Sequence, residues 1–447
     1  MGRSVAPRLA RASAAALGLV LLLAACDDSE PLLPGPREDV RASAGPTIIA
    51  AAARGGAEGP AAIALAPPRR LPDWPLRVGN ASNDPGHATL RRAPVRIWSA
   101  DIGRGDTRRQ RIVADPVSDG ARVYTLDARA TVSATTTGGA TVWRRSLVPA
   151  SDRATDASGG GVGVADGTVY VTTGFGELHA LDAATGATRW VQALDAPLAT
   201  PKPVGGTVYV VSRDARGWAI DAVSGRVRWD LAAAPAGPVS ATAPAPAVAG
   251  DAVIFPFGGG DVVAVDRTRG ERLWTAGVLG RRIGVAYNDV GDITGDPVVA
   301  DGRVVLGTTS GRIVALDRAT GARAWTATEG AVSPVVVAGG AVFAVTDRAQ
   351  LIRLDASSGA VVWRTDLPFH EARRLVRRDA VVAHFGPVLA GGLLWVASSD
   401  GAVRGFDPAT GRLASTAPVP GGAASRPMPM QDALFVVGRR GALHAFR

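Results

Sequence analysis

The chain of 447 residues contains a single cysteine, Cys26, and only five histidines. With one cysteine, a disulfide within the chain and the CxxCH motif that attaches haem are both excluded. The sequence also has no HExxH zinc motif, no GxSxG nucleophile motif, and no phosphate-binding loop of the form GxxxxGKS or GxxxxGKT. His179 and His444 occupy the same place in the similar stretches GELHA and GALHA, which favours a role in strand structure. We therefore predict no catalytic residue, no bound metal and no cofactor.

The first 26 residues have the pattern of an export signal. Arg3, Arg8 and Arg11 form a positively charged start, and residues 12–23 form an apolar stretch that is short for a bilayer span. The stretch ends in Leu-Ala-Ala-Cys at Cys26, which resembles the lipobox of bacterial lipoprotein precursors. In such precursors the peptide is cleaved before the cysteine, which then carries lipid, so we predict lipidation of Cys26. An ordinary signal peptide with an incidental cysteine is the alternative.

Residues 27–70 are predicted to form a flexible tether. They are rich in proline, alanine and glycine and show no sustained strand or helix period. A flexible chain of this length reaches roughly 35–40 Å, enough to hold a folded domain away from a membrane. Asp27 and Asp28 directly follow the cysteine. In some enteric bacteria an aspartate there favours retention in the inner membrane, so the choice between the two membranes stays open.

The formal net charge is +9, and arginine supplies all but one of the 49 basic residues. The exception is Lys202. Clusters of arginine can meet anionic lipid or an acidic partner surface, although charge solvated on loops is the favoured interpretation. The chain lacks the interleaved basic and aromatic residues that single-strand binders use, and it follows an export signal. We therefore predict no nucleic-acid partner.

One fifteen-residue unit, GELHALDAATGATRW from Gly176 to Trp190, organises the rest of the chain. Its first half alternates in the period of a half-buried strand. Asp182 can then accept backbone N–H bonds across a tight turn, and Gly186 can take the positive φ that the turn requires. Trp190 follows on the next strand as a large surface that needs a packing partner.

The unit recurs along the chain with its tryptophan. Related stretches are GDVVAVDRTRGERLW, GRIVALDRATGARAW and AQLIRLDASSGAVVW, with degraded copies elsewhere. The tryptophans at repeat positions are Trp98, Trp143, Trp190, Trp229, Trp274, Trp325 and Trp363. Ser415 takes the eighth position, and successive gaps run from 38 to 52 residues, as in four-stranded propeller blades.

The repeat predicts an all-β fold, an eight-bladed β-propeller spanning residues 71–447. The strand that carries Trp98 lacks its own third strand, and the final stretch GALHAFR lacks its fourth. Together, these two incomplete copies form one four-stranded blade. We therefore expect the ring to close by pairing an N-terminal strand with the C-terminal blade, which leaves no free end.

The motif A-L-D-x-x-T-G-x-x-x-W resembles the tryptophan-docking motif of the pyrroloquinoline quinone (PQQ) propeller superfamily. This superfamily contains PQQ-dependent dehydrogenases as well as proteins that never bind the quinone. If this chain were such a dehydrogenase, the resemblance would imply adjacent cysteines, a Ca²⁺ site and an aspartate base. The single cysteine here excludes the cysteine pair. A funnel lined by convergent carboxylates and stacked aromatics would favour the enzyme.

The lipobox, the tether, the eight-bladed ring and WPLRVGNASNDPGH, from Trp74 to His87, together resemble the BamB-like lipoprotein family. The resemblance implies a non-catalytic scaffold anchored in the outer membrane and facing the periplasm. Its implied partners are the POTRA domains of BamA, other subunits of the β-barrel assembly machinery, and unfolded barrel precursors. A PQQ-dependent periplasmic dehydrogenase and a ligand-binding or sensory propeller are the alternatives.

An acidic stretch contains Asp289, Asp292 and Asp296. It lacks the alternating positions and terminal glutamate of a calcium loop, so turn chemistry or a protein contact is favoured over a metal. The BamB resemblance implies an acidic D-x-D strip that binds a partner just before a strand. Asp292 matches its first acid, whereas Thr294 departs at the second. We predict this stretch as the partner-binding region.

Overall fold

The computed structural model describes residues 63–156, 158–234, 244–280, 293–309, 311–371 and 380–447. The chain divides into two compact units, residues 1–59 and 60–447, and every described residue belongs to the second unit. The predicted signal peptide and lipidation site, Cys26, lie outside the described residues. Among the described residues, no helix is long and apolar enough to cross a membrane.

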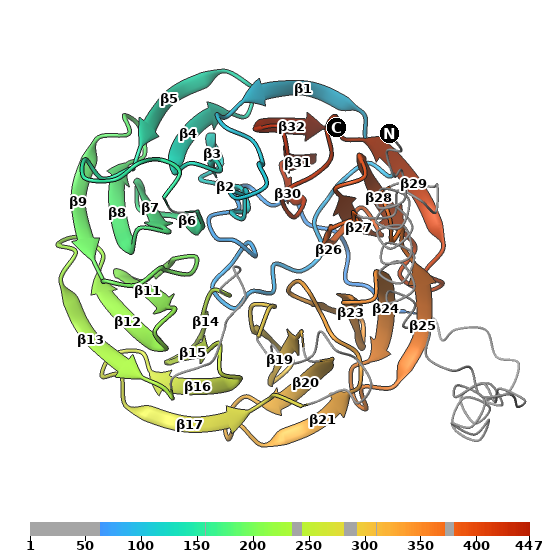
Figure 1. Cartoon of the computed structure of the whole chain (residues 1–447). Coiled ribbons are helices and arrows are strands. Elements are labelled where there is room, and N and C mark those ends of the chain that lie inside the picture. The colour runs from blue at the N-terminus through green and yellow to red at the C-terminus, as the bar shows by residue number, and fades with distance from the viewer. Residues whose placement is uncertain (1–62, 157, 235–243, 281–292, 310, 372–379) are drawn as a thin grey trace, which may run out of the picture. The chain divides into compact units, whose positions relative to one another are not determined.

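The second unit is an eight-bladed β-propeller, which confirms the predicted fold (Figure 1). Each blade is a sheet of four antiparallel strands. Blade 1 contains β2 (Val117–Ser118), β3 (Arg122–Leu126), β4 (Thr131–Thr136) and β5 (Thr141–Ser146). Blade 2 contains β6 (Gly160–Ala165), β7 (Thr168–Thr173), β8 (Glu177–Asp182) and β9 (Thr188–Ala193). Blade 3 contains β10 (Lys202–Val204), β11 (Thr207–Ser212), β12 (Arg216–Asp221) and β13 (Val227–Ala232). Blade 4 contains β14 (Ala247–Ala249), β15 (Ala252–Pro256), β16 (Asp261–Asp266) and β17 (Arg272–Gly277).

The remaining blades continue round the ring in chain order (Figure 1). Blade 5 contains β18 (Val298–Ala300), β19 (Arg303–Thr308), β20 (Arg312–Asp317) and β21 (Arg323–Ala327). Blade 6 contains β22 (Val336–Ala338), β23 (Ala341–Val345), β24 (Gln350–Asp355) and β25 (Val361–Asp366). Blade 7 contains β26 (His384–Ala390), β27 (Leu393–Ser398), β28 (Ala402–Phe406) and β29 (Leu413–Pro418). Blade 8 contains β30 (Met428–Met430), β31 (Ala433–Gly438), β32 (Ala442–Phe446) and the N-terminal β1 (Arg96–Asp101).

The burial of each strand follows its distance from the ring axis. The second strand of blade 2, β7, is buried along its whole length because neighbouring blades cover both of its faces. The outermost strand, β9, alternates between exposed and half-buried residues. Apolar surface is therefore buried mainly between blades, where its removal from water stabilises the ring by roughly 25 cal/mol per Å².

Blade 8 closes the ring as predicted. In it, β1 pairs antiparallel with β32, placing Trp98 opposite Ala445 and Ala100 opposite Leu443. Beyond the ladder, the backbone N–H groups of Val95 and Arg447 each donate to the other residue's carbonyl at 2.9 Å. The first and last strands therefore share one sheet, and the propeller has no open seam.

Each docking tryptophan packs on a glycine in a turn of the following blade. A Cβ on Gly225 would lie 2.7 Å from the Trp190 ring, and the φ of Gly225 is +73°, so the turn needs glycine for both reasons. The Trp190 indole N–H also donates to the Ala222 carbonyl at 3.1 Å. The corresponding pairs are Trp98 with Gly139, Trp143 with Gly186, Trp229 with Gly270, Trp274 with Gly321, Trp325 with Gly359, and Trp363 with Gly411.

In most of these turns an aspartate holds the loop that receives the tryptophan; the blade 1 turn that receives Trp98 has none, and there the Thr136 hydroxyl accepts from the Ala140 N–H at 3.0 Å. Asp182 Oδ1 accepts from the backbone N–H groups of Ala184 and Thr185, at 3.0 and 2.9 Å, and from the Thr185 hydroxyl. Ser415 takes the place of a tryptophan because the next blade offers no such turn: there β32 and β1 are paired but not joined by the chain.

An axial segment, residues 71–90, crosses the centre of the ring (Figure 1). Its backbone forms hydrogen bonds with the backbone of the innermost strands of several blades. The contacts are Trp74 with Ser118, Pro75 with Val164, Ala81 with Val248, Ser82 with Val299, and Ala88 with Leu389. Residues 63–70, which the sequence places in the tether, also contact the propeller, since Ile63 and Leu65 pack against a core cluster of blades 6 and 7.

Candidate functional site

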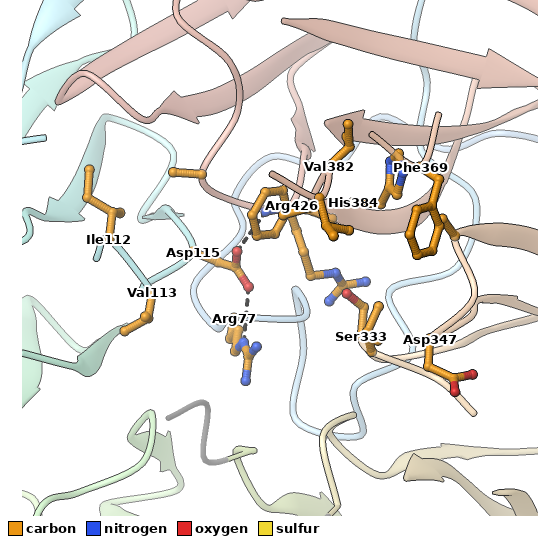
Figure 2. A pocket seen from close by; sticks show the side chains of 16 residues that line it. Arg77, Ile112, Val113, Asp115, Ser333, Asp347, Phe369, Val382, His384 and Arg426 are labelled. Carbon is orange, nitrogen blue, oxygen red and sulfur yellow. Dashed lines mark hydrogen bonds and ion pairs between the residues drawn. The ribbon is translucent and has the colours of Figure 1, made fainter. Parts of the chain in front are cut away.

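A cavity of about 340 Å³ lies at the centre of the ring. Its wall is assembled from connections between blades: residues 112–115 between β1 and β2, residues 332–333 between β21 and β22, residues 381–383 before β26, and residues 424–426 before β30. Arg77 of the axial segment also lines it, so side chains from both ends of the chain converge there (Figure 2). We call this space the axial cavity.

A second cavity of about 590 Å³ adjoins the axial cavity. The two share several lining residues: Ile112, Val113, Val381, Ala383, Phe385 and Ala424. The second cavity is lined by a charged cluster with two ion pairs. Arg439 pairs with Glu371 at 2.8 Å, and Arg111 pairs with Asp106 at 3.3 Å. Its charges are therefore largely balanced within the protein.

Arg77 is held between two carboxylates on the ring axis. Its Nε donates to Asp115 Oδ2 at 3.0 Å, and its Nη1 donates to Asp296 Oδ1 at 2.8 Å. Asp296 is fully buried and also accepts from the backbone N–H of Ala245 at 3.0 Å. Burial opposes the charge on Arg77, but Asp296 and Asp115 outweigh it and raise the pKa of Arg77. This pair of contacts ties the axial segment to blades 1 and 5.

Lys202, the only lysine, is buried beside the same group. Its ammonium donates to the Asn80 carbonyl at 3.2 Å and to Asn83 Oδ1. Asn83 in turn donates to the Pro297 carbonyl at 2.8 Å. Burial lowers the pKa of Lys202 to about 7, with a smaller lowering from Arg77 and a partial offset by Asp296.

Arg426 lines the cavity with an incomplete set of hydrogen-bond partners. Its side chain is 4% exposed, and its Nη2 donates to the Pro387 carbonyl at 3.1 Å. Asp115 accepts from the backbone N–H of Arg426, at 2.7 Å, and not from its guanidinium. Within the described part of the chain, its Nε and Nη1 have no hydrogen-bond partner. Burial lowers the pKa of Arg426, and the nearby carboxylates of Asp115 and Asp296 offset part of this effect through electrostatic attraction, while Arg77 adds to it.

His384 lines the cavity with both ring nitrogens engaged. Nδ1 is 2.7 Å from the Ser398 hydroxyl and Nε2 is 2.9 Å from the Pro368 carbonyl. Burial lowers the pKa of His384, so the ring is neutral at pH 7. The two carboxylates of the wall, Asp115 and Asp347, stand apart in Figure 2 and do not converge.

The residues predicted as the partner-binding region fall into two groups. Asp289 and Asp292 lie outside the described residues. Asp296 lies inside the ring, against Arg77. Sequence reasoning missed Arg77, Asp115 and Arg426 as members of a site because no spacing links them. For Lys202 the sequence offered one indication of a special role, because it is the only lysine in the chain. Across the described ranges, no group of three or more histidine, cysteine or acidic side chains could hold a metal ion.

Comparison with known proteins connects this architecture to two kinds of propeller. The sequence profile of the family described as outer membrane protein assembly factor BamB matches residues 128–365, more than half of the chain. No curated protein sequence matches significantly.

Among solved structures, BamB from Moraxella catarrhalis is similar, with a TM-score of 0.67 and 20% identity over 79% of this chain and 100% of that chain. A europium-containing methanol dehydrogenase has a TM-score of 0.63 and 16% identity over 81% of this chain and 89% of that one. A quinohemoprotein alcohol dehydrogenase from Comamonas testosteroni has a TM-score of 0.63 and 16% identity, covering 85% and 81%. At such identities these likenesses establish the fold alone.

Proposed function

Because this chain belongs to the family of the outer membrane protein assembly factor BamB, we propose that it is a non-catalytic scaffold of the β-barrel assembly machinery. The observation that carries the proposal is the family match, which runs from the third strand of blade 1 into the last strand of blade 6. A propeller offers wide surfaces built from loops, and such surfaces suit protein docking. In this role the chain binds the POTRA domains of BamA and helps to pass barrel precursors to the membrane.

The lipobox at Cys26 supports an anchored form of this scaffold. Acyl chains on Cys26 would hold the protein at the outer membrane, facing the periplasm, because one chain alone gives only marginal attachment and two or more give lasting attachment. Asp27 and Asp28 leave inner-membrane retention as the alternative for the anchor. The tether then places the propeller within reach of periplasmic partners.

A PQQ-dependent dehydrogenase is the competing function, since two of the similar structures are dehydrogenases. Two ionisable residues of the axial cavity, Asp115 and His384, are already engaged within the protein. Both oxygens of Asp115 are engaged, one by Arg77 and one by the backbone of Arg426, and both nitrogens of His384 are hydrogen-bonded. A general base needs a free position within reach of a substrate proton. This arrangement supports the scaffold over the enzyme.

The proposal is tested by direct binding of the purified chain to the POTRA region of BamA from the same organism. The double substitution Asp289→Lys and Asp292→Lys is expected to weaken binding about tenfold or more, because reversed charges oppose a complementary surface. Asp251→Lys, in the exposed turn between β14 and β15, is the matched control and keeps wild-type affinity. Asp296 is left intact because reversal would place two buried cations together.

If the double substitution leaves binding unchanged, the partner surface lies elsewhere on the ring. Absence of any binding, together with tight PQQ binding and dye-linked alcohol oxidation, would contradict the scaffold and favour the dehydrogenase.

A further inference from the structure

The axial cavity joins an apolar wall to a buried cation with unfilled hydrogen-bond positions. We propose that it binds a small organic monocarboxylate with a compact apolar body, the carboxylate lying on the side of Arg426 and the apolar body against the mouth. This ligand site goes beyond the scaffold role and does not depend on it.

The apolar part of the site is built at the cavity mouth. Val332, Phe369 and Val381 line it and are 37%, 47% and 57% exposed. The less exposed Val113 and Val382, labelled in Figure 2, and Phe385 continue the wall. Covering such side chains favours binding in proportion to the apolar area removed from water. A ligand with an aromatic or branched aliphatic body would gain this contribution, whereas acetate or formate would not.

The charged part of the site is Arg426. A buried guanidinium without partners is unfavourable, because desolvation is not offset by hydrogen bonds. The described protein supplies its guanidinium with one acceptor only, the Pro387 carbonyl. Carboxylate is the acceptor that guanidinium binds best, through short charge-assisted bonds. In surroundings of low dielectric constant, an anion is attracted to this charge even before contact.

The neighbouring charges favour one carboxylate and no more. Arg77 is already balanced by Asp115 and Asp296, so its charge is not available to a ligand. Asp347 also lines the cavity and stands apart from Arg426 in Figure 2. A volume of about 340 Å³ is near the lower end for small-molecule sites, which fits a compact body.

The test is isothermal titration calorimetry of the full-length chain with phenylacetate as the probe. We expect saturable binding of phenylacetate with one site per chain. Acetate, which lacks the apolar body, and phenylacetamide, which lacks the charge, are each expected to bind at least about tenfold more weakly. Equal affinity for phenylacetamide, or no saturable phenylacetate binding at millimolar concentration, would overturn the proposal.

Variants locate the bound carboxylate. Arg426→Gln should lower phenylacetate affinity at least about tenfold, whereas Arg439→Gln, in the adjoining cavity, should leave it unchanged. If Arg426→Gln fails to fold, Val332→Glu replaces it, because an added carboxylate at the exposed mouth repels the anion without disturbing the core. Wild-type affinity in Arg426→Gln or, where that variant is unfolded, in Val332→Glu would overturn the proposal. BamA binding is measured separately, so failure here leaves the scaffold proposal standing.

Discussion

Lys202 is buried at the centre of the ring, where its ammonium donates to Asn80 and to Asn83 of the axial segment. The cost of burying its charge lowers its pKa to about 7, from an ordinary value of 10.5. Between these two pH values the unfolded chain holds a proton that the folded chain has released. The contribution of Lys202 to stability therefore rises as pH rises through this window.

Lys202→Met should remove this pH dependence. We expect the stability of the wild-type protein relative to Lys202→Met to increase by about 1 kcal/mol per pH unit between pH 7 and pH 9. Urea unfolding midpoints of both proteins at the two pH values measure the change. Other titrating groups are common to both proteins and cancel in the comparison. Parallel pH dependences would contradict a lowered pKa of Lys202 in the folded protein.

Two docking tryptophans differ in one hydrogen bond. The indole N–H of Trp190 donates to the Ala222 carbonyl, whereas that of Trp229 has no acceptor among the described residues. Trp190→Phe should therefore cost about 1 kcal/mol more in unfolding free energy than Trp229→Phe. Both rings pack on a glycine and a tyrosine, Trp229 has a further contact with Phe255, and phenylalanine keeps an aromatic ring at each site, so the hydrogen bond is the main polar difference. Equal losses in chemical denaturation would show that this bond adds nothing.

At the scale of elements, the pairing of β1 with β32 carries the closure of the ring. Five residues of β1 lie opposite β32, and Trp98 on β1 docks on Gly139 of blade 1. The strand therefore holds blade 8 together and also fastens it to its neighbour.

Deleting residues 92–102 should open the ring and lower the thermal midpoint markedly, because losing the Trp98 docking alone costs about 3 kcal/mol. Deleting residues 30–40 of the predicted tether is the control and should leave the midpoint unchanged. Calorimetry of the two shortened proteins makes the comparison. A midpoint equal to the full-length value after removal of 92–102 would mean that closure contributes little.

The elements of the ring were predictable because each copy of the repeat contains the residues that its turn and its docking contact need. Asp182 holds the turn, Gly225 takes a positive φ and leaves room, and Trp190 covers it. The axial site was not predictable in this way. Arg77 and Asp296 are 219 positions apart and are joined only once the ring is closed. Asp296 stood in an acidic stretch of the sequence, and only the structure places its carboxylate inside the ring.

At the scale of the whole molecule, the propeller combines a closed frame with an axial centre that the N-terminal segment holds together. The frame positions loops for protein contacts, and the family to which the chain belongs supports a place in outer-membrane protein assembly. The axial cavity is a separate feature, whose ligand is proposed from its own residues.

The scaffold role is tested most directly by capturing the full-length chain from crosslinked native envelopes and identifying the recovered proteins by mass. We expect BamA to be recovered with the wild-type chain and with Asp251→Lys, and its recovery to fall when Asp289 and Asp292 are both changed to lysine. Envelopes that yield the chain without BamA, from a protein that binds PQQ tightly and oxidises alcohols with a dye acceptor, would contradict it.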